Sequence, residues 1–132
     1  MLIQNISNKY NLNLTGQKRF NECKFKRKLP FDFYQEKNKI LIEYDGEQHF
    51  LKNNHYNLKK EGNFEELITK DLIKTKYAIN NGFHFLRIAY TDKENIEKIL
   101  IYFLLKVKYS DYNQVVMFSN PSLYMKTYSL IR

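Results

Sequence analysis

Two short apolar segments of the chain carry carboxylates at positions where a β-strand ordinarily holds apolar side chains. Asp32 lies in the run LPFDFY, and Glu43 and Asp45 lie in the run ILIEYDGEQHF. Because side chains alternate along a strand, Glu43 and Asp45 are expected on one face, opposite the face carrying Ile40, Ile42 and Tyr44. If the strand carrying Asp32 pairs with this one, the three carboxylates meet. Clustered acids repel unless a cation joins them, and hard divalent ions prefer oxygen ligands. The pattern therefore predicts a metal site on paired strands.

The composition limits the class of protein that carries this site. The chain has 132 residues, a net charge of +8 and a pI near 9.4, which predicts one domain with a basic surface and polyanionic partners. Hydrophobic residues make up 43% of the chain, enough to form a core, so wholesale disorder is not expected. The single cysteine, Cys23, forms no internal disulfide and belongs to no zinc-binding pattern.

No apolar run approaches the roughly 20 residues of a membrane span, and the N-terminus lacks the apolar core of a secretory signal. We therefore expect an intracellular protein with no membrane partner. The abundance of Lys, Asn, Ile and Tyr, with no Trp, is what an AT-rich coding sequence produces. That leaves a viral, a bacterial and an organellar (mitochondrial) source open.

Basic residues concentrate in the segment 17–28, where Glu22 is the only acid. The pattern predicts a first strand with a basic exposed face. Contact with the phosphates of a nucleic acid is the favoured interpretation, and the alternative is a solvated sheet edge that discourages strand association. The candidate nucleic-acid-binding residues, including three from the polar loop 51–62, are Lys18, Arg19, Lys24, Lys26, Arg27, Lys28, Lys52, Lys59 and Lys60.

Hydrophobic periodicity and turn residues predict an α/β fold with a mixed sheet in the order β-β-β-α-β-α. Pro30 cannot donate a ladder hydrogen bond, so the second strand is expected to begin there. The first three strands form an antiparallel meander. The expected elements are strands over 17–28, 30–34 and 39–45, a helix over 64–80, a strand over 84–90 and a helix over 91–108. The resulting domain, 17–108, lies between extended arms over 1–16 and 109–132.

This plan resembles the restriction-endonuclease-like superfamily, whose signature is PD-(D/E)XK. Within it, the chain is most similar to the very-short-patch mismatch-repair endonucleases and the EDxHD-type homing endonucleases. The resemblance covers residues 17 to about 105. It is carried by LPFDFY, by IEYDGEQHF, by Asp71 and Lys74 in KDLIKTKYAINNG, and by the strand FLRIAY.

The resemblance implies a catalytic set, residue by residue. Asp32 matches the metal-binding aspartate, although Phe31 separates it from Pro30, and Asp45, with Glu43, matches the next acidic position. The other matching residues are His49 after the glycine turn, Asp71 on the helix and Lys74 one turn later. Asp32 and Asp45 would bind Mg2+. His49 would act as a general base or proton relay, and Lys74 would stabilise the charge that develops on the phosphate.

Two departures from the family pattern leave two functions open. Asp45 stands where the ExK motif has lysine, a change that the EDxHD relatives tolerate. Residues 1–16 contain no acid, whereas the N-terminal helix of those relatives contributes a glutamate. The first function is a Mg2+-dependent, phosphodiester-cleaving DNA endonuclease of the homing or repair type. The second is a non-cleaving, degenerate endonuclease-like domain that needs no cofactor. Such a domain would be a structural RNA-binding component, for example of an organellar ribosome, with rRNA and other ribonucleoprotein subunits as partners.

Overall fold

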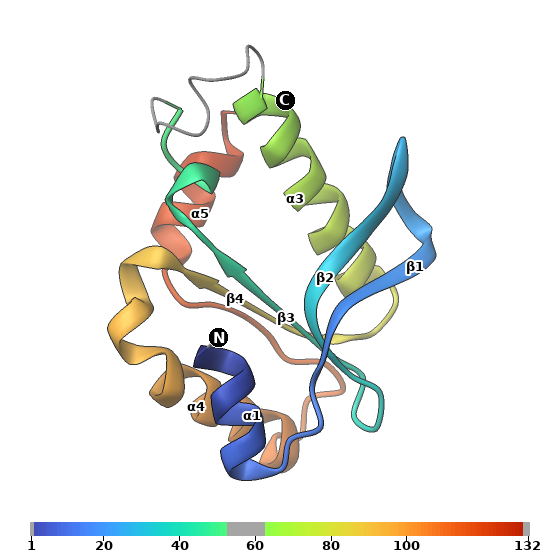
Figure 1. Cartoon of the computed structure of the whole chain (residues 1–132), viewed down its shortest axis with the longest axis vertical. Coiled ribbons are helices and arrows are strands. Elements are labelled where there is room, and N and C mark those ends of the chain that lie inside the picture. The colour runs from blue at the N-terminus through green and yellow to red at the C-terminus, as the bar shows by residue number, and fades with distance from the viewer. Residues whose placement is uncertain (1, 53–62, 131–132) are drawn as a thin grey trace.

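A five-stranded mixed sheet forms the centre of the molecule in the computed structural model, which describes residues 2–52 and 63–130 (Figure 1). The strands lie in the order β1-β2-β3-β4-β5. β1 to β3 pair antiparallel, and β3 to β5 pair parallel. Their bounds are β1 Thr15–Phe25, β2 Arg27–Gln35, β3 Ile40–Asp45, β4 His84–Ala89 and β5 Val116–Phe118. The expected mixed α/β fold with an antiparallel meander is confirmed.

Helices cover both faces of the sheet (Figure 1). One face packs against α1 and α4 and the other against α3, while α5 lies beside α3. Among the residues that the structure describes, the helices and 3-10 turns are α1 Leu2–Tyr10, η1 Glu47–His49, α3 Asn63–Asn80, η2 Tyr90–Asn95, α4 Ile96–Tyr109 and α5 Pro121–Tyr128. In the part of the chain that the structure describes, no helix has both the length and the apolar character needed to cross a membrane.

Strand β3 divides its side chains between the two faces as its alternation predicts. Ile40 and Ile42 are buried in the core shared with α1 and α4, and Tyr44 packs against its edge. Leu41 lies in the core on the α3 side. Glu43 and Asp45, which alternate in phase with Leu41, therefore face α3. The acids lie under a helix, where each needs a partner.

The β1–β2 hairpin is longer than predicted, and Pro30 does not begin its second strand. β2 starts at Arg27, and Pro30 is paired with Arg19. The register shifts between Arg19, which pairs with Pro30, and Lys24, which pairs with Lys28. This part of β1 therefore has more residues than the part of β2 that faces it. Such an irregularity tolerates a proline because the ladder is locally interrupted. The prediction that Pro30 opens the strand was wrong for this reason.

Residues 1–16 were predicted to form an extended arm, and that prediction was wrong. α1 buries Ile3 and Ile6 against the core that α4 also covers. The Ser7 hydroxyl accepts a hydrogen bond from the Leu14 amide at 3.2 Å, which ties the helix to the chain entering β1. The helix is only nine residues long, so two buried positions are too few to reveal a period in the sequence.

The prediction that residues 109–132 form an extended C-terminal arm was also wrong for the residues that the structure describes, which end at 130. β5 pairs with β4, and α5 follows with Pro121 in its first turn and the Asn120 side chain accepting from the Leu123 amide at 3.3 Å. The helix before this segment, α4, also begins later than residue 91, where the sequence predicted its start. Asp92 has non-helical backbone angles and accepts from Ser119 at 2.7 Å, so α4 begins only at Ile96.

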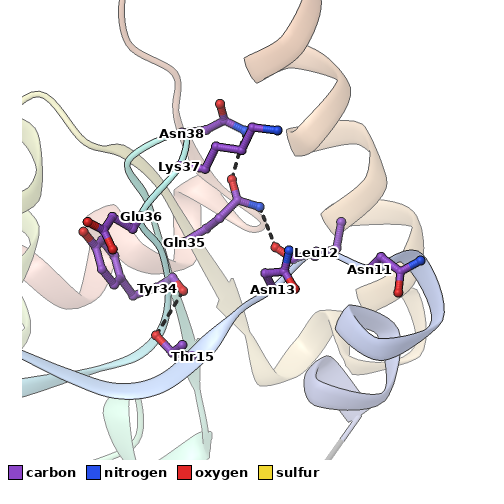
Figure 2. Close-up of a pocket in the computed structure, with 9 residues that line it drawn as sticks. All are labelled: Asn11, Leu12, Asn13, Thr15, Tyr34, Gln35, Glu36, Lys37 and Asn38. Carbon is purple, nitrogen blue, oxygen red and sulfur yellow. Dashed lines mark hydrogen bonds between the residues drawn. The ribbon is translucent and has the colours of Figure 1, made fainter.

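A polar cavity of about 380 Å³ lies beside the β2–β3 turn, near the residue at which β3 begins. Figure 2 shows Gln35 between two partners: its amide donates to the Leu12 carbonyl at 2.7 Å and its carbonyl accepts from Asn38 at 2.9 Å. These bonds join the α1–β1 connection to the β2–β3 turn. The cavity is far along β3 from the carboxylates, so it is separate from the predicted site.

Candidate functional site

Six residues singled out in the sequence lie in one hydrogen-bonded network at the end of β3. They come from β2, β3, η1 and α3 and are Asp32, Glu43, Asp45, His49, Asp71 and Lys74. Arg87 of β4 connects the two halves of the network, with Nη1 2.7 Å from Asp45 and 3.9 Å from Glu43. The parallel β3–β4 pairing sets Arg87 directly beside Glu43.

Asp32 lies where the ladder between β2 and β3 stops. The last ladder pair in this direction is Phe33 with Ile42. Beyond it, the Asp32 amide donates to Glu43 Oε1 at 2.9 Å, and the Tyr44 amide donates to Asp32 Oδ2 at 2.9 Å. Burial raises the pKa of Asp32, although the Tyr44 bond opposes the shift. Side chains thus satisfy the backbone amides where the two strands separate.

Glu43 forms a buried ion pair with Lys74. Their charged atoms are 2.8 Å apart, and the two residues are 2% and 8% exposed. Burial raises the pKa of Glu43 to about 7, against the lowering by the Lys74 and Arg87 charges. Lys74 also lies 5.2 Å from the centre of the Phe31 ring. This pair brings a cation from α3 to the point where β2 and β3 diverge.

Asp45 is fully buried beside Arg87 and the phenol of Tyr124. Arg87 Nη1 donates to Asp45 Oδ1 and Oδ2 at 2.7 and 2.8 Å, and Tyr124 donates to Oδ2 at 2.7 Å. Although burial raises it, the Arg87 charge holds the pKa of Asp45 below its ordinary value. Arg87 also donates to Thr75 Oγ1 and to the Asp71 carbonyl, both at 3.0 Å. The guanidinium is therefore paired and hydrogen-bonded, as a buried charge requires.

His49 and Asp71 make a part-buried contact. Nδ1 of His49 lies 2.6 Å from Asp71 Oδ2 and 3.7 Å from Asp45 Oδ1, and its side chain is 16% exposed. Burial lowers the pKa of His49, but the bond to Asp71 and the carboxylate charges raise it above its ordinary value. The contact with Asp71 and the nearby carboxylate charges therefore favour the protonated form of the His49 ring.

The donor atoms of Asp45, His49 and Asp71 all lie within 4.8 Å of one another, which fits a divalent cation. A carboxylate oxygen has two acceptor positions. Arg87 and Tyr124 both bind Oδ2 of Asp45, whereas Oδ1, the oxygen facing His49, accepts a hydrogen bond from Arg87 alone among the described residues. Oδ1 thus retains an acceptor position. A His49 ring with no proton on Nδ1 would offer that nitrogen as the third ligand beside the two carboxylates.

Asp32 stands outside this group of donor atoms among the described residues. The pairing of Asp32 with Asp45 as metal ligands therefore stays a prediction, and the geometry groups Asp45 with His49 and Asp71 instead. The network also contains residues that sequence reasoning missed: Thr75, Arg87 and Tyr124. A signal existed for Arg87, a charge inside the apolar run HFLRIAY. Tyr124 had none, because it lies 79 residues from Asp45.

Six of the nine predicted nucleic-acid-binding cations belong to the β1–β2 hairpin, whose strands are labelled in Figure 1. Lys24 is paired directly with Lys28 across the hairpin. Directly opposed like charges destabilise a sheet, so this pairing suits contact with an anion. Lys26 lies 3.9 Å from Glu66, a long and exposed ion pair. Lys52 is exposed, and Lys59 and Lys60 lie outside the described residues.

Comparison with known proteins places the chain in a family. Residues 27–124 match the family of unknown function DUF5889. The match covers most of the chain, including every residue of the network, so the chain belongs to this family. No curated protein and no solved structure matches the chain. Any function must therefore be argued from the geometry of the network.

Proposed function

We propose that the protein is a Mg2+-dependent DNA endonuclease of the homing or repair type, built on a restriction-endonuclease-like core. One observation carries the proposal. Strands, turn and helix bring Asp45, His49 and Asp71 within 4.8 Å of one another, beside the Glu43–Lys74 pair. Three donors of this chemistry, next to a lysine, form a set suited to phosphodiester hydrolysis.

Asp45, His49 and Asp71 would hold the ion. A bound divalent ion supplies a water of lowered pKa and neutralises charge on a phosphate. Residues of the chain set the charge and the orientation of these ligands. The Arg87 charge lowers the pKa of Asp45, and before an ion binds the Asp71 contact at Nδ1 holds the His49 ring in place.

Lys74 lies 2.8 Å from Glu43 and is slightly exposed, so its ammonium can approach a phosphate oxygen at the edge of the site. Asp32 fixes the β2–β3 junction under that ammonium through its bond to the Tyr44 amide. The basic hairpin supports a nucleic acid as the substrate, because its cations supply sequence-independent attraction to phosphates.

A second function, a non-cleaving RNA-binding component of a ribonucleoprotein particle, is favoured by a different observation. Arg87 and Tyr124 together make three hydrogen bonds to Asp45, so a protein cation already neutralises the carboxylate. α1 occupies the N-terminal position but contains no acidic residue. A site in this condition can be retained for stability alone.

The two functions are separated by assaying the nicking of supercoiled DNA by the full chain with Mg2+, with Mn2+ and with chelator. The nuclease proposal predicts metal-dependent nicking that falls about 100-fold or more in Asp71→Asn, because the carboxylate both binds and orients. Asp111→Asn, an exposed aspartate outside the network, is the matched control and should retain activity.

Thermal unfolding of both variants verifies that they fold. Equal nicking by Asp71→Asn and the unchanged chain would remove Asp71 from the mechanism. A folded chain that binds RNA and nicks no DNA under any of the three conditions would favour the second function.

A further inference from the structure

The outward face of α4 and the segment after it expose several large side chains. Tyr102, Leu105, Tyr109 and Tyr112 are 54%, 50%, 71% and 77% exposed. The opposite face of α4 is buried in the core, through Leu100 and Phe103 among others. Grouped exposure of this kind on a folded protein marks an interaction surface. We call Tyr102, Tyr109 and Tyr112, with Lys106 among them, the tyrosine surface.

Two adjoining hollows shape this surface. One, of about 390 Å³, is lined by Tyr102, Leu105, Lys106, Tyr109 and Ser110. The other, of about 470 Å³, shares Tyr102, Lys106 and Ser110 with the first and extends past Tyr112 to β5. The shared residues make the hollows continuous. No acidic residue of the described chain lines either one.

Lysines lie against the tyrosine rings. Lys106 Nζ is 5.5 Å from the centre of the Tyr102 ring, and Lys108 Nζ is 5.2 Å from that of Tyr109. Rings supply flat faces on which nucleobases stack, whatever the base, and neighbouring ammonium groups pair with the phosphates between bases. The combination of exposed rings, cations and no lining acid is complementary to an unpaired polynucleotide strand.

A second copy of the chain is a poorer occupant for the tyrosine surface. Most symmetric dimers use the same patch on both partners, so Lys106 and Lys108 would approach the same residues of the other copy. Like charges placed together across an interface oppose binding, and each chain already has a net charge of +8. An anionic partner removes this repulsion.

We propose that the tyrosine surface binds single-stranded DNA, with unpaired bases stacked on Tyr102, Tyr109 and Tyr112. The choice of DNA over RNA rests on the proposed endonuclease function, whereas the stacking itself does not. α4 covers the opposite face of the sheet from α3, so this surface is separate from the network that contains Asp71 (Figure 1). The protein would contact paired DNA through its basic hairpin and unpaired DNA through α4.

Fluorescence provides a direct test, because the chain contains no tryptophan. Tyr109→Trp introduces a single indole into the tyrosine surface. Titration with oligothymidine in chelator should quench its emission saturably, since stacking brings a base against the ring. Tyr10→Trp is the matched control. Tyr10 is 41% exposed and lies 5.2 Å from Lys9 Nζ, but it lines neither hollow, so its emission should not change.

Affinity measurements then separate stacking from simple apolar contact. By fluorescence anisotropy with labelled oligothymidine, Tyr109→Phe should bind as the unchanged chain does, and Tyr109→Leu should bind on the order of 5- to 100-fold more weakly. Equal binding by the leucine variant overturns the proposal. So does a dimer, seen by sedimentation, that Lys106→Leu strengthens.

Tighter binding of oligouridine than of oligothymidine overturns the choice of DNA. All of these measurements are made without metal, so they do not depend on cleavage. If nicking is absent but oligothymidine still quenches Tyr109→Trp, the endonuclease proposal fails while the tyrosine surface stands.

Discussion

The network at the end of β3 and the β1–β2 hairpin handle positive charge in opposite ways. In the network, Arg87 and Lys74 are buried and each lies within 2.8 Å of a carboxylate oxygen. On the hairpin, Lys24 and Lys28 are exposed and face each other across the strands. A buried charge is costly unless a group inside the protein pairs with it, whereas an exposed charge is solvated by water and stays available to bind another molecule. The contrast separates residues that hold the fold from residues available for binding.

The largest effect should come from removing a buried cation. Arg87→Met leaves Asp45 buried with Tyr124 and His49 as its remaining side-chain partners among the described residues, and breaking such a pair costs about 3 to 5 kcal/mol. The free energy of unfolding, measured with urea, should fall by this amount or the variant should not fold. Arg27→Met, on the exposed hairpin, is the control and should change stability by less than about 0.5 kcal/mol. Similar losses of unfolding free energy in Arg87→Met and Arg27→Met would contradict the proposed difference between the network and the hairpin.

Glu43 should impose a pH dependence on stability. Its pKa in the folded protein is about 7, above the ordinary 4.5, so the folded state binds the proton more tightly than the unfolded state. The resulting stabilisation is fully present below about pH 4.5 and is lost as the pH rises toward about 7. The slope has a limit of about 1.4 kcal/mol per pH unit for one proton.

Urea unfolding at several pH values measures this dependence. Glu43→Gln cannot titrate, so its stability should vary less over the same interval. Glu36→Gln, exposed in the β2–β3 turn, is the matched control and should keep the slope of the unchanged chain. A slope that survives in Glu43→Gln would mean that another group binds the proton.

The smallest effect on stability should come from the hairpin lysines, where the effect on binding is larger. Lys24→Gln removes one of two directly opposed like charges, so stability should stay the same or rise by a few tenths of a kcal/mol. Affinity for duplex DNA should fall, and the salt dependence of log K should decrease by about one unit per lost phosphate contact. Lys93→Gln, exposed on η2, serves as the control. An unchanged salt dependence in Lys24→Gln would exclude this lysine from phosphate contact.

The sequence predicted the central elements well because their burial pattern is visible in short segments. Ile40 and Ile42 alternate with Leu41 and Glu43, so the two faces of β3 could be assigned before any partner was known. α3 was likewise predicted over nearly its full length. The terminal helices were missed because each is short and becomes a helix with a buried face only when packed against a distant part of the chain.

For the candidate site, the sequence by itself determined which residues to expect in one network: the acids, His49 and Lys74 are recognisable from their types and order. Only the tertiary structure decided how they pair. Asp45 meets Arg87 across 42 residues and Tyr124 across 79, its Oδ1 lies 3.7 Å from His49, and its donor atoms group with those of His49 and Asp71 and not with Asp32 among the described residues. Pairing depends on distances in space between strands and helices, and residue spacing along the chain does not specify those distances.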